Sequence, residues 1–421
     1  MQADLIIYNI GTLITPKHKT LPVRGKKMND LKQIKRAFIA VKNGVIMDCG
    51  GYDYQNKVGP KTVMHNAHGN IVMPGLIDSH THLVHAGSRE DEFIDKIEGV
   101  PYLDILKSGG GILSTVAKTR KATFDELYKK AYKSLDYMLL NGVTTIEAKS
   151  GYGLNEKTEF KQLEVAKKLN ENHHIDIVST YLGAHAIPKE YSKNKRGYID
   201  EVIRIMELVK KENLAKFADV FLEDTVFNRE DTARILINAD RLGFFLKLHA
   251  DEIVSLGGAT LAAKLNAASA DHLMAIDDEG IKYLSKVNTV ANILPSTSFY
   301  LNKDYAPVRK MIDNNIAISI ASDYNPGSSP SENFQFVMQL AANKLKMYPS
   351  EIINAATINA AYNLKLSETI GSIERGKNAD IVIFNSNNLN YIMYHFGINH
   401  TKDVFKNGKL VVHKQKILEE N

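Results

Sequence analysis

Eight short apolar segments, most of them separated by amphipathic helical stretches, occupy residues 70–360 and restrict the fold more than any other feature of the chain. They are residues 75–82, 142–153, 175–185, 217–224, 244–251, 267–273, 289–295 and 317–323. Eight strands that alternate with helices predict an α/β protein with a (β/α)8 TIM barrel. The rival fold is a doubly wound open sheet, which usually carries a glycine-rich phosphate loop after its first strand. No G-x-G-x-x-G sequence occurs there.

Strand-like sequence also occurs at both ends of the chain. Apolar runs near the two termini are interrupted by Asn43-Gly44 and Asn407-Gly408, and Asn-Gly is a strong signal for a tight β-hairpin turn. Chain termini often lie close together, so we expect the two ends to form one small β-sandwich domain. The predicted domains are a composite β-sandwich (residues 1–69 and 361–421) and a barrel (residues 70–360).

The composition excludes several classes of protein. Cys49 is the only cysteine, so the chain has neither an internal disulfide nor a cysteine-based zinc site. No apolar run reaches the roughly 18 residues that a membrane span needs. The N-terminus lacks the basic-then-apolar layout of a signal peptide. We therefore expect a cytoplasmic protein with no membrane partner.

Positive charge is concentrated in one segment of the chain, residues 16–36, although the net charge is only +5. Such a segment can bind nucleic acid or another partner, but charge runs more often keep a loop in water. We interpret residues 16–36 as a solvated surface loop between two strands, and we expect no nucleic-acid partner.

Polar side chains end most of the eight apolar segments. Six segments end in titratable or metal-binding residues, which are His80 and His82, His185, Glu223, His249 with Asp251 and Glu252, His272, and Asp323. In a TIM barrel the chemistry takes place at the C-terminal ends of the strands. The pattern therefore predicts a functional site at that end of the barrel.

A metal ion is the ligand that these residues fit best. His80 and His82 are two apart in an extended segment, so both imidazoles point to the same side. His249 and Asp323 supply the further nitrogen and oxygen ligands that zinc or iron takes, with one position left open for water. The alternative is a pair of structural histidines that hydrogen-bond in the barrel mouth. His85 lies in the following loop and is not expected to be a ligand.

Several longer motifs resemble a known family. They are PGLIDSHTHLVHAGSREDEF, EAKSGYGL, LGAHAIPKEY, ASADHL and SDYNPGSSP. The first resembles the strand-one signature of the amidohydrolase superfamily. Together the motifs look like its branch that hydrolyses the cyclic amide of 4-imidazolone-5-propanoate to N-formimidoyl-L-glutamate in L-histidine degradation. The resemblance covers essentially the whole chain and implies a TIM barrel, a small β-sandwich and one zinc or iron ion.

The resemblance also implies which residues contact the substrate, a small molecule with a carboxylate tail. These residues are Arg89, Tyr152, His185, Glu252, Asn325, Gly327 and Ser328. The guanidinium of Arg89 can grip a carboxylate with two parallel hydrogen bonds. Barrels of this kind are often homodimers, and we expect one here.

Three residues are expected to move protons or stabilise charge during hydrolysis. Asp323 can accept a proton from the attacking water, and Glu252 can carry a proton to the leaving ring nitrogen. His272 is expected to hydrogen-bond the water or the oxyanion, or alternatively to orient Asp323. The fourth strand offers Glu223 and no lysine that could be carbamylated, which favours one metal ion.

Two rival functions stay open at this stage. A mononuclear deaminase of a heterocyclic base would use the same metal ligands but would not need Arg89 for a carboxylate tail. A non-catalytic metal-binding barrel would have no use for an acid such as Glu252 beside the open position. The sequence favours a hydrolase that acts on carbon–nitrogen bonds of cyclic amides.

Overall fold

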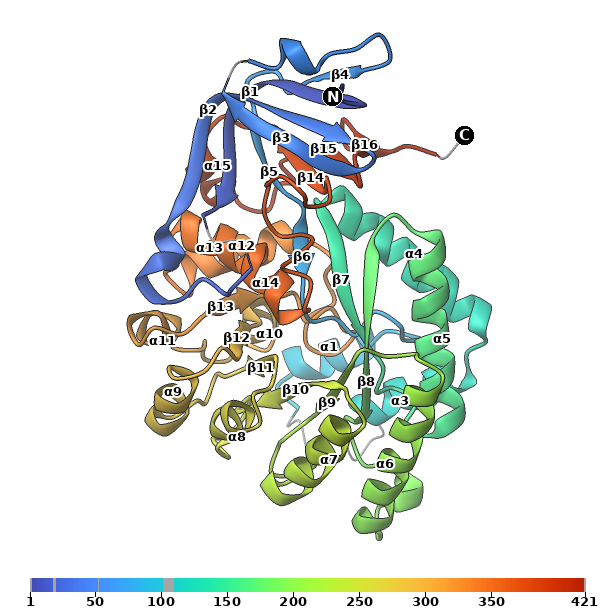
Figure 1. The fold of residues 1–421 in the computed structure, drawn as a ribbon. Helices are drawn as coiled ribbons and strands as arrows, with labels where there is room; N and C mark the ends of the chain where they lie inside the picture. Colours follow the sequence, from blue (N-terminus) through green and yellow to red (C-terminus); the bar gives the residue numbers. More distant parts are fainter. Residues whose placement is uncertain (1, 18–19, 52, 101–109, 420–421) are drawn as a thin grey trace.

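Two β-sheets organise the chain in the computed structural model, which describes residues 2–17, 20–51, 53–100 and 110–419. One is an eight-stranded sheet from the middle of the chain, and the other is a nine-stranded sheet from its two ends. Figure 1 shows the second sheet above the first, with both termini in it.

The eight-stranded sheet forms the predicted barrel. Its strands are β6 (Leu76–Asp78), β7 (Val143–Lys149), β8 (Asp176–Ala184), β9 (Phe217–Val220), β10 (Phe245–Ala250), β11 (Ser269–His272), β12 (Val290–Ile293) and β13 (Ile318–Ile320). They neighbour one another in chain order, and all pairs are parallel. Each is shorter than its predicted segment by residues at one or both ends. A doubly wound sheet would reverse its strand order, so that rival was wrong.

The barrel closes beyond the ends of β6 and β13. The backbone N–H of His82 donates to the carbonyl of Tyr324 (2.8 Å), and that of Asp323 donates to the carbonyl of His80 (3.1 Å). Thr81 and Tyr324 form the corresponding parallel bridge. His80 and His82 were expected inside the first strand, but they lie just past it. Between them, Thr81 accepts from the N–H of Lys149 in β7 and also bridges to Tyr324 after the last strand.

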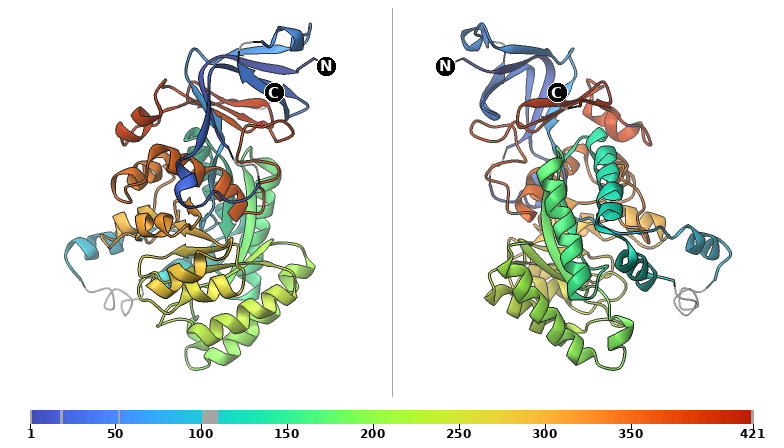
Figure 2. Two further views of the ribbon diagram at one scale, coloured as in Figure 1. Left: turned by 60° about the vertical axis from the view of Figure 1, so that its left-hand side comes forward. Right: turned by 90° about the vertical axis from the view of Figure 1, so that its right-hand side faces the viewer.

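Helices cover the outside of the barrel (Figure 2). They are α1 (Glu90–Ile97), α3 (Ile112–Lys121), α4 (Phe124–Leu140), α5 (Glu156–Asn172), α6 (Lys195–Lys211), α7 (Arg229–Arg241), α8 (Gly258–Lys264), α9 (Asp278–Leu284), α10 (Pro295–Tyr300), α11 (Val308–Asp313), α12 (Phe334–Asn343), α13 (Pro349–Ala356) and α14 (Ile358–Asn363), with the 3₁₀ turn η3 (Lys189–Tyr191) before α6. The local sequence determines where two of these helices begin. Capping boxes are formed by Thr123 with Glu126 at the start of α4 and by Asn228 with Asp231 at the start of α7. In the described residues, no helix is long and apolar enough to cross a membrane.

The nine-stranded sheet combines both ends of the chain, as predicted. Its strands are β1 (Leu5–Pro16), β2 (Leu31–Lys42), β3 (Val45–Gly51), β4 (Val63–Asn66), β5 (Ile71–Pro74), β14 (Ile381–Phe384), β15 (Thr401–Lys406), β16 (Lys409–His413) and β17 (Lys416–Ile417). The short elements η1 (Gly25–Asn29), η2 (Gln55–Lys57) and α15 (Leu389–Tyr394) lie between them. The strands enclose a core with members from β1, β2, β5, β14 and β15.

Both predicted hairpin turns are confirmed. Asn43-Gly44 joins β2 to β3 and Asn407-Gly408 joins β15 to β16, with positive φ at all four residues. The division into domains at 69/70 and 360/361 stays a prediction. β5, just after the first of these boundaries, pairs with β1 and β14 in the terminal sheet.

The basic segment 16–36 is only in part the loop between two strands that we expected. Residues 31–36 belong to β2 and pair with the end of β1, and Lys35 Nζ donates to Thr12 Oγ1 (2.9 Å). Arg24 donates to the backbone carbonyls of Ser285 (2.7 Å) and Asn315 (3.0 Å) on the barrel. Residues 18 and 19 lie outside the described residues. Much of the positive charge therefore lies on strand β2, in which the long basic side chains are exposed to solvent.

Lys406 joins the terminal sheet to the barrel. Its Nζ lies 2.6 Å from Asp380 Oδ2 in the sheet and 2.7 Å from Asp176 Oδ2 at the start of β8. Lys406 and Asp380 are both buried. The ion pair therefore couples two parts of the fold whose residues are far apart in sequence.

Candidate active site

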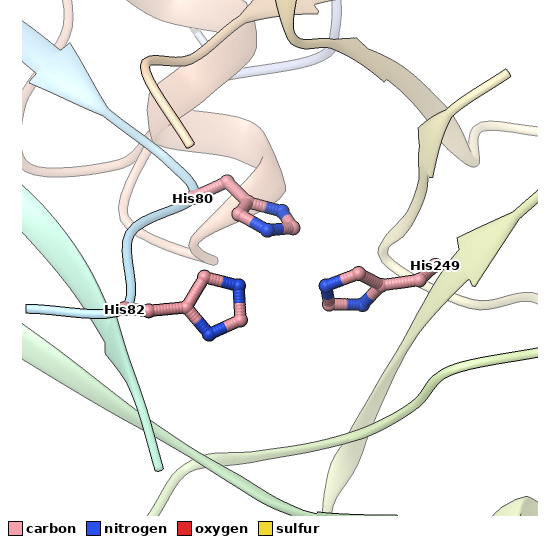
Figure 3. A group of neighbouring side chains, drawn as sticks. All are labelled: His80, His82 and His249. Atoms are coloured by element: carbon pink, nitrogen blue, oxygen red, sulfur yellow. The ribbon is translucent and has the colours of Figure 1, made fainter. Parts of the chain in front are cut away.

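Four predicted ligands meet at the C-terminal end of the barrel. His80 and His82 follow β6, His249 lies in β10, and Asp323 follows β13. Figure 3 shows the three imidazole rings turned toward one another, and one nitrogen from each lies within 4.8 Å of the others. Asp323 Oδ1 is 3.4 Å from His80 Nε2 and 3.5 Å from His82 Nε2. The barrel therefore brings the four side chains to one point.

Several imidazole nitrogens in this cluster are buried without a hydrogen-bond partner among the described residues. They are His80 Nε2, His82 Nδ1, His249 Nε2 and both ring nitrogens of His272. Burial lowers the pKa values of His80, His82 and His272, which keeps these rings neutral. His85 lies apart from the cluster, with Nδ1 2.9 Å from the carbonyl oxygen of His82. Buried polar atoms are normally satisfied, so the free nitrogens indicate a place for a ligand.

The donor set fits one zinc or iron ion. Neutral imidazole nitrogens and a carboxylate oxygen are ligands that both metals take. Burial raises the pKa of Asp323 to about 6, and a bound cation would favour its ionised form. The other closely spaced groups of potential ligands in the described residues also include His80, so they overlap with this site.

Two hydroxyl groups hold the carboxylate of Asp323. Thr297 Oγ1 donates to Asp323 Oδ2 (2.6 Å), and Ser328 Oγ donates to the same oxygen (3.3 Å). Oδ1 is left facing His80 and His82. Sequence reasoning did not single out Thr297, because it lies in α10, outside the strand ends.

Glu252 and His272 lie together beside the ligand cluster. His272 Nε2 is 3.5 Å from Glu252 Oε2, and the His272 ring is 5.1 Å from His249 and 5.5 Å from His80, between ring centroids. Burial and the charge of Asp323 raise the pKa of Glu252 to about 8. A protonated carboxyl group can therefore donate a proton at neutral pH.

Arg89 supplies a largely buried cation at the same end of the barrel, with Nε 4.0 Å from Glu92 Oε1. Its Nε donates to Thr115 Oγ1 (2.9 Å). Nη2 is buried and has no hydrogen-bond partner in the described part of the chain. A Cβ on Gly327 would come within 2.2 Å of Arg89 Nη1, so a larger residue there would displace the guanidinium. This arrangement fits the binding of a small anion.

The rings of His185 and Tyr152 pack together next to His82. The rings of His82 and His185 stack with centroids 4.9 Å apart, and the Tyr152 ring is 5.2 Å from His185. His185 Nδ1 donates to the carbonyl of Gly151 (3.0 Å), which leaves Nε2 as an acceptor. Burial lowers the pKa of His185 to about 3, so the ring is neutral.

Asn325 is occupied within its own loop. Its Nδ2 donates to the carbonyl of Asp323 (2.6 Å) and to Ser328 Oγ (2.8 Å), while its Oδ1 accepts from the N–H groups of Gly327 and Ser328. These bonds shape the turn that carries Asp323. A direct contact of Asn325 or Ser328 with substrate stays a prediction.

Two carboxylates behind the ligands were missed by sequence reasoning. His80 Nδ1 lies 2.5 Å from Asp271 Oδ2, and His249 Nδ1 lies 3.0 Å from Asp219 Oδ2. Burial lowers the pKa of His249, but the charge of Asp219 outweighs it and the net shift is upward. The sequence did contain a signal for Asp219 and Asp271, because each is a charged residue inside an otherwise apolar strand segment. No motif, however, connects either aspartate to a histidine in another segment.

Known proteins are similar to this chain over nearly its whole length. The model of the amidohydrolase family matches residues 71–411. An imidazolonepropionase of Fusobacterium nucleatum subsp. nucleatum is 54% identical over 416 residues, which cover 98% of this chain and all of that protein. An imidazolonepropionase of Streptococcus pyogenes serotype M6 is 48% identical over 421 residues, which cover 99% of this chain and all of that protein.

A solved structure supports the fold alone. The crystal structure of an adenosine deaminase from Xanthomonas campestris with bound zinc covers 100% of this chain and 95% of its own, with a TM-score of 0.73 and 18% identity. Such low identity carries no information on substrate, whereas the matches at 48–54% identity extend over nearly the whole chain. The chain therefore belongs to the amidohydrolase family and, within it, to the imidazolonepropionases.

Proposed function

We propose that this chain hydrolyses the ring amide of 4-imidazolone-5-propanoate to N-formimidoyl-L-glutamate. The water oxygen forms a bond to the ring carbonyl carbon, the carbon–nitrogen bond of the ring breaks, and the released nitrogen takes a proton. The relatives' names and the family match support this reaction, and they do not favour the deaminase alternative.

One observation supports this substrate most directly. Arg89 Nη2 is buried without a hydrogen-bond partner among the described residues, and Nη1 of the same group lies beside Gly327, four residues after the predicted ligand Asp323. A carboxylate can accept from both terminal nitrogens of a guanidinium, so the propionate tail fits this position. A heterocyclic base without a carboxylate would leave Arg89 Nη2 without an acceptor among the described residues, which is costly.

The ion that His80, His82, His249 and Asp323 would hold supplies Lewis acidity, which makes hydroxide available at neutral pH. Asp323 would take the proton of the attacking water at a carboxylate oxygen. His272 would hydrogen-bond the developing oxyanion. Glu252, protonated at neutral pH, would deliver its proton to the leaving nitrogen. Zinc and iron both fit the donor set, and each stands as a candidate.

The remaining contacts position the ring. Tyr152 and His185 would pack against the imidazolone, and His185 Nε2 would accept a hydrogen bond from it. Ser328 and Gly327 would border the tail beside Arg89. The cytoplasmic location and the homodimer stay predictions from the sequence.

A direct assay tests the proposal. The purified chain, loaded separately with zinc and with iron, is supplied with 4-imidazolone-5-propanoate, and the loss of the substrate's ultraviolet absorbance is followed. We expect turnover, formation of N-formimidoyl-L-glutamate by mass spectrometry, and no release of ammonia. Ammonia release from a heterocyclic base, or no turnover with either metal, contradicts the proposal. The His80→Ala variant is the inactive control.

A further inference from the structure

A layer of polar side chains crosses the interior of the barrel directly behind the ligand cluster. Every strand or its end contributes to this polar layer, which consists of Ser79, Glu147, Lys149, Thr180, Asp219, Lys247, Asp271, Asn292 and Ser319. Each of these side chains belongs to a residue that is at most 2% exposed. Branched apolar residues usually fill this part of a TIM barrel. A fully buried polar layer in place of these apolar residues therefore indicates a function other than filling the barrel.

Two lysines neutralise most of the negative charge in the polar layer. Lys149 Nζ lies 2.7 Å from Asp219 Oδ2, 3.0 Å from Glu147 and 3.9 Å from Asp271 Oδ2. Lys247 Nζ donates to Glu147 Oε2 (3.0 Å) and to the carbonyl of Ser79 (3.0 Å). Burial opposes the charge of Lys149, but the three carboxylates outweigh it and raise its pKa. Lys149 is therefore a fixed internal cation that binds Glu147 and Asp219 directly and lies 3.9 Å from Asp271.

These two aspartates are the residues that touch the predicted ligands. Asp271 Oδ2 already accepts a hydrogen bond from Asn292 Nδ2 (3.2 Å) and lies 2.5 Å from His80 Nδ1, so this oxygen is placed to accept from His80 as well. His249 Nδ1 lies 3.0 Å from Asp219 Oδ2, although the contact is bent away from the N–H direction. In both rings the other nitrogen, Nε2, is left without a partner in the described residues.

The orientation of Asp271 is itself fixed by the polar layer. Asn292 Nδ2 donates to Asp271 Oδ2 (3.2 Å). The other end of the amide, Oδ1, accepts from the hydroxyls of Ser79 (3.0 Å) and Ser319 (2.7 Å). Two donors on Oδ1 determine which way the amide points, so its NH₂ group must face Asp271.

We propose that the polar layer is the positioning scaffold of the metal site: Asp271 and Asp219, held by Lys149, orient His80 and His249 with Nε2 free for the ion. Carboxylates behind ligand histidines fix the tautomer and make the imidazole a stronger donor. The inference rests on the proposed metal site. The experiment measures metal binding without substrate, so a chain that binds metal but does not hydrolyse the proposed substrate would not contradict the positioning role.

Isosteric variants test the positioning role. Asp271→Asn and Asp219→Asn are compared with the wild type for zinc affinity, by competition with a chelator of known affinity. Loss of such outer partners typically weakens metal binding about 10- to 100-fold. We expect a loss of that size for Asp271→Asn and a smaller one for Asp219→Asn, whose contact is bent.

Asp380→Asn is the matched control. Asp380 is also a buried aspartate paired with a lysine, Lys406, but it lies in the terminal sheet. We expect this variant to lower the melting temperature of the metal-free protein and to leave zinc affinity unchanged. Zinc affinity of Asp271→Asn within threefold of the wild type, or an equal loss in Asp380→Asn, would overturn the inference.

A measurement on the wild type keeps the test valid if a variant does not fold. Nitrogen-15 NMR of histidine side chains in the metal-free protein reports which ring nitrogen carries the proton, and a His80→Asn sample assigns the signal. We expect His80 to carry its proton on Nδ1 before any metal is added. A proton on Nε2 would contradict the positioning role directly.

Discussion

At the scale of single residues, Arg89 carries the strongest information about substrate. Its guanidinium is held by Thr115 through Nε, while Nη2 is buried and unpaired in the described structure. A buried donor without an acceptor costs free energy, although Glu92 Oε1 lies 4.0 Å from Nε on the other side of the group. In the proposed function, Arg89 would therefore select for substrates with a carboxylate.

Replacing Arg89 tests this selection. We expect Arg89→Met to lower kcat/KM about 30- to 1000-fold, because a paired charged contact is worth about 2–4 kcal/mol and each 1.4 kcal/mol is tenfold. Most of the change is expected in KM, since the tail lies away from the reacting carbonyl. Steady-state kinetics measure it. An analogue without the carboxylate serves as the control: an equal loss on that analogue would show that Arg89 acts in some other way.

Glu252 is the second residue whose role can be isolated. Because its raised pKa keeps it protonated at pH 7, Glu252→Gln removes the proton donor with little change in shape. We expect kcat to fall about 10²- to 10⁴-fold, as for other general acids, with zinc affinity unchanged. Zinc content and single-turnover rates measure both. A variant that keeps more than a third of wild-type kcat would exclude Glu252 as the acid.

At the scale of elements, the eight barrel strands could be predicted because buried parallel strands appear as short apolar runs. The Asn-Gly hairpins could be predicted from their local backbone requirements. Residues 31–36 were misassigned, because a strand with exposed basic residues has the composition of a loop. The polar layer was missed because Asp271 and Asn292 acquire their partners only from the register between strands, which no single segment contains.

The junction between α5 and β8 contains a histidine that responds to pH. His173 Nδ1 accepts from the N–H of Ile175 (3.0 Å), and its ring packs edge-on against Tyr132 at 4.9 Å. Burial lowers the pKa of His173 to about 3, below its usual value near 6.5. Between these pH values the unfolded chain binds a proton that the folded chain does not, so stability falls as pH falls below about 6.5.

His173→Asn should remove this dependence, because an amide oxygen can accept from Ile175 without titrating. Between pH 7.5 and 5.5 we expect the wild type to lose about 1 kcal/mol more free energy of unfolding than the variant. Urea unfolding at both pH values measures it, and other buried histidines cancel in the difference. Equal losses in the two proteins would mean that His173 is already protonated at pH 5.5.

At the scale of the whole molecule, Lys406 connects the two sheets. It is buried and pairs with Asp380 in the terminal sheet and Asp176 in the barrel. Breaking a buried ion pair by removing one partner leaves an uncompensated charge. The contact between the sheets should therefore depend strongly on this one side chain.

Lys406→Met is expected to lower the free energy of unfolding by about 3–5 kcal/mol, since the Asp380 carboxylate stays buried. Lys406→Met combined with Asp380→Asn should recover part of the loss, because no buried charge is left. Chemical denaturation of the three proteins measures the changes. If the double variant is less stable than the single one, the desolvated charge is not the cause.

The closure of the barrel beyond β6 and β13 has a consequence for how the enzyme would lose activity as it unfolds. His80 and Asp323 are at once the joint between the first and last strands and half of the predicted ligand set. Early loosening of this joint by heat or denaturant would disperse the ligands while the outer helices are still intact. Inactivation should therefore run ahead of the loss of helical circular dichroism, and added zinc should delay the first process more than the second.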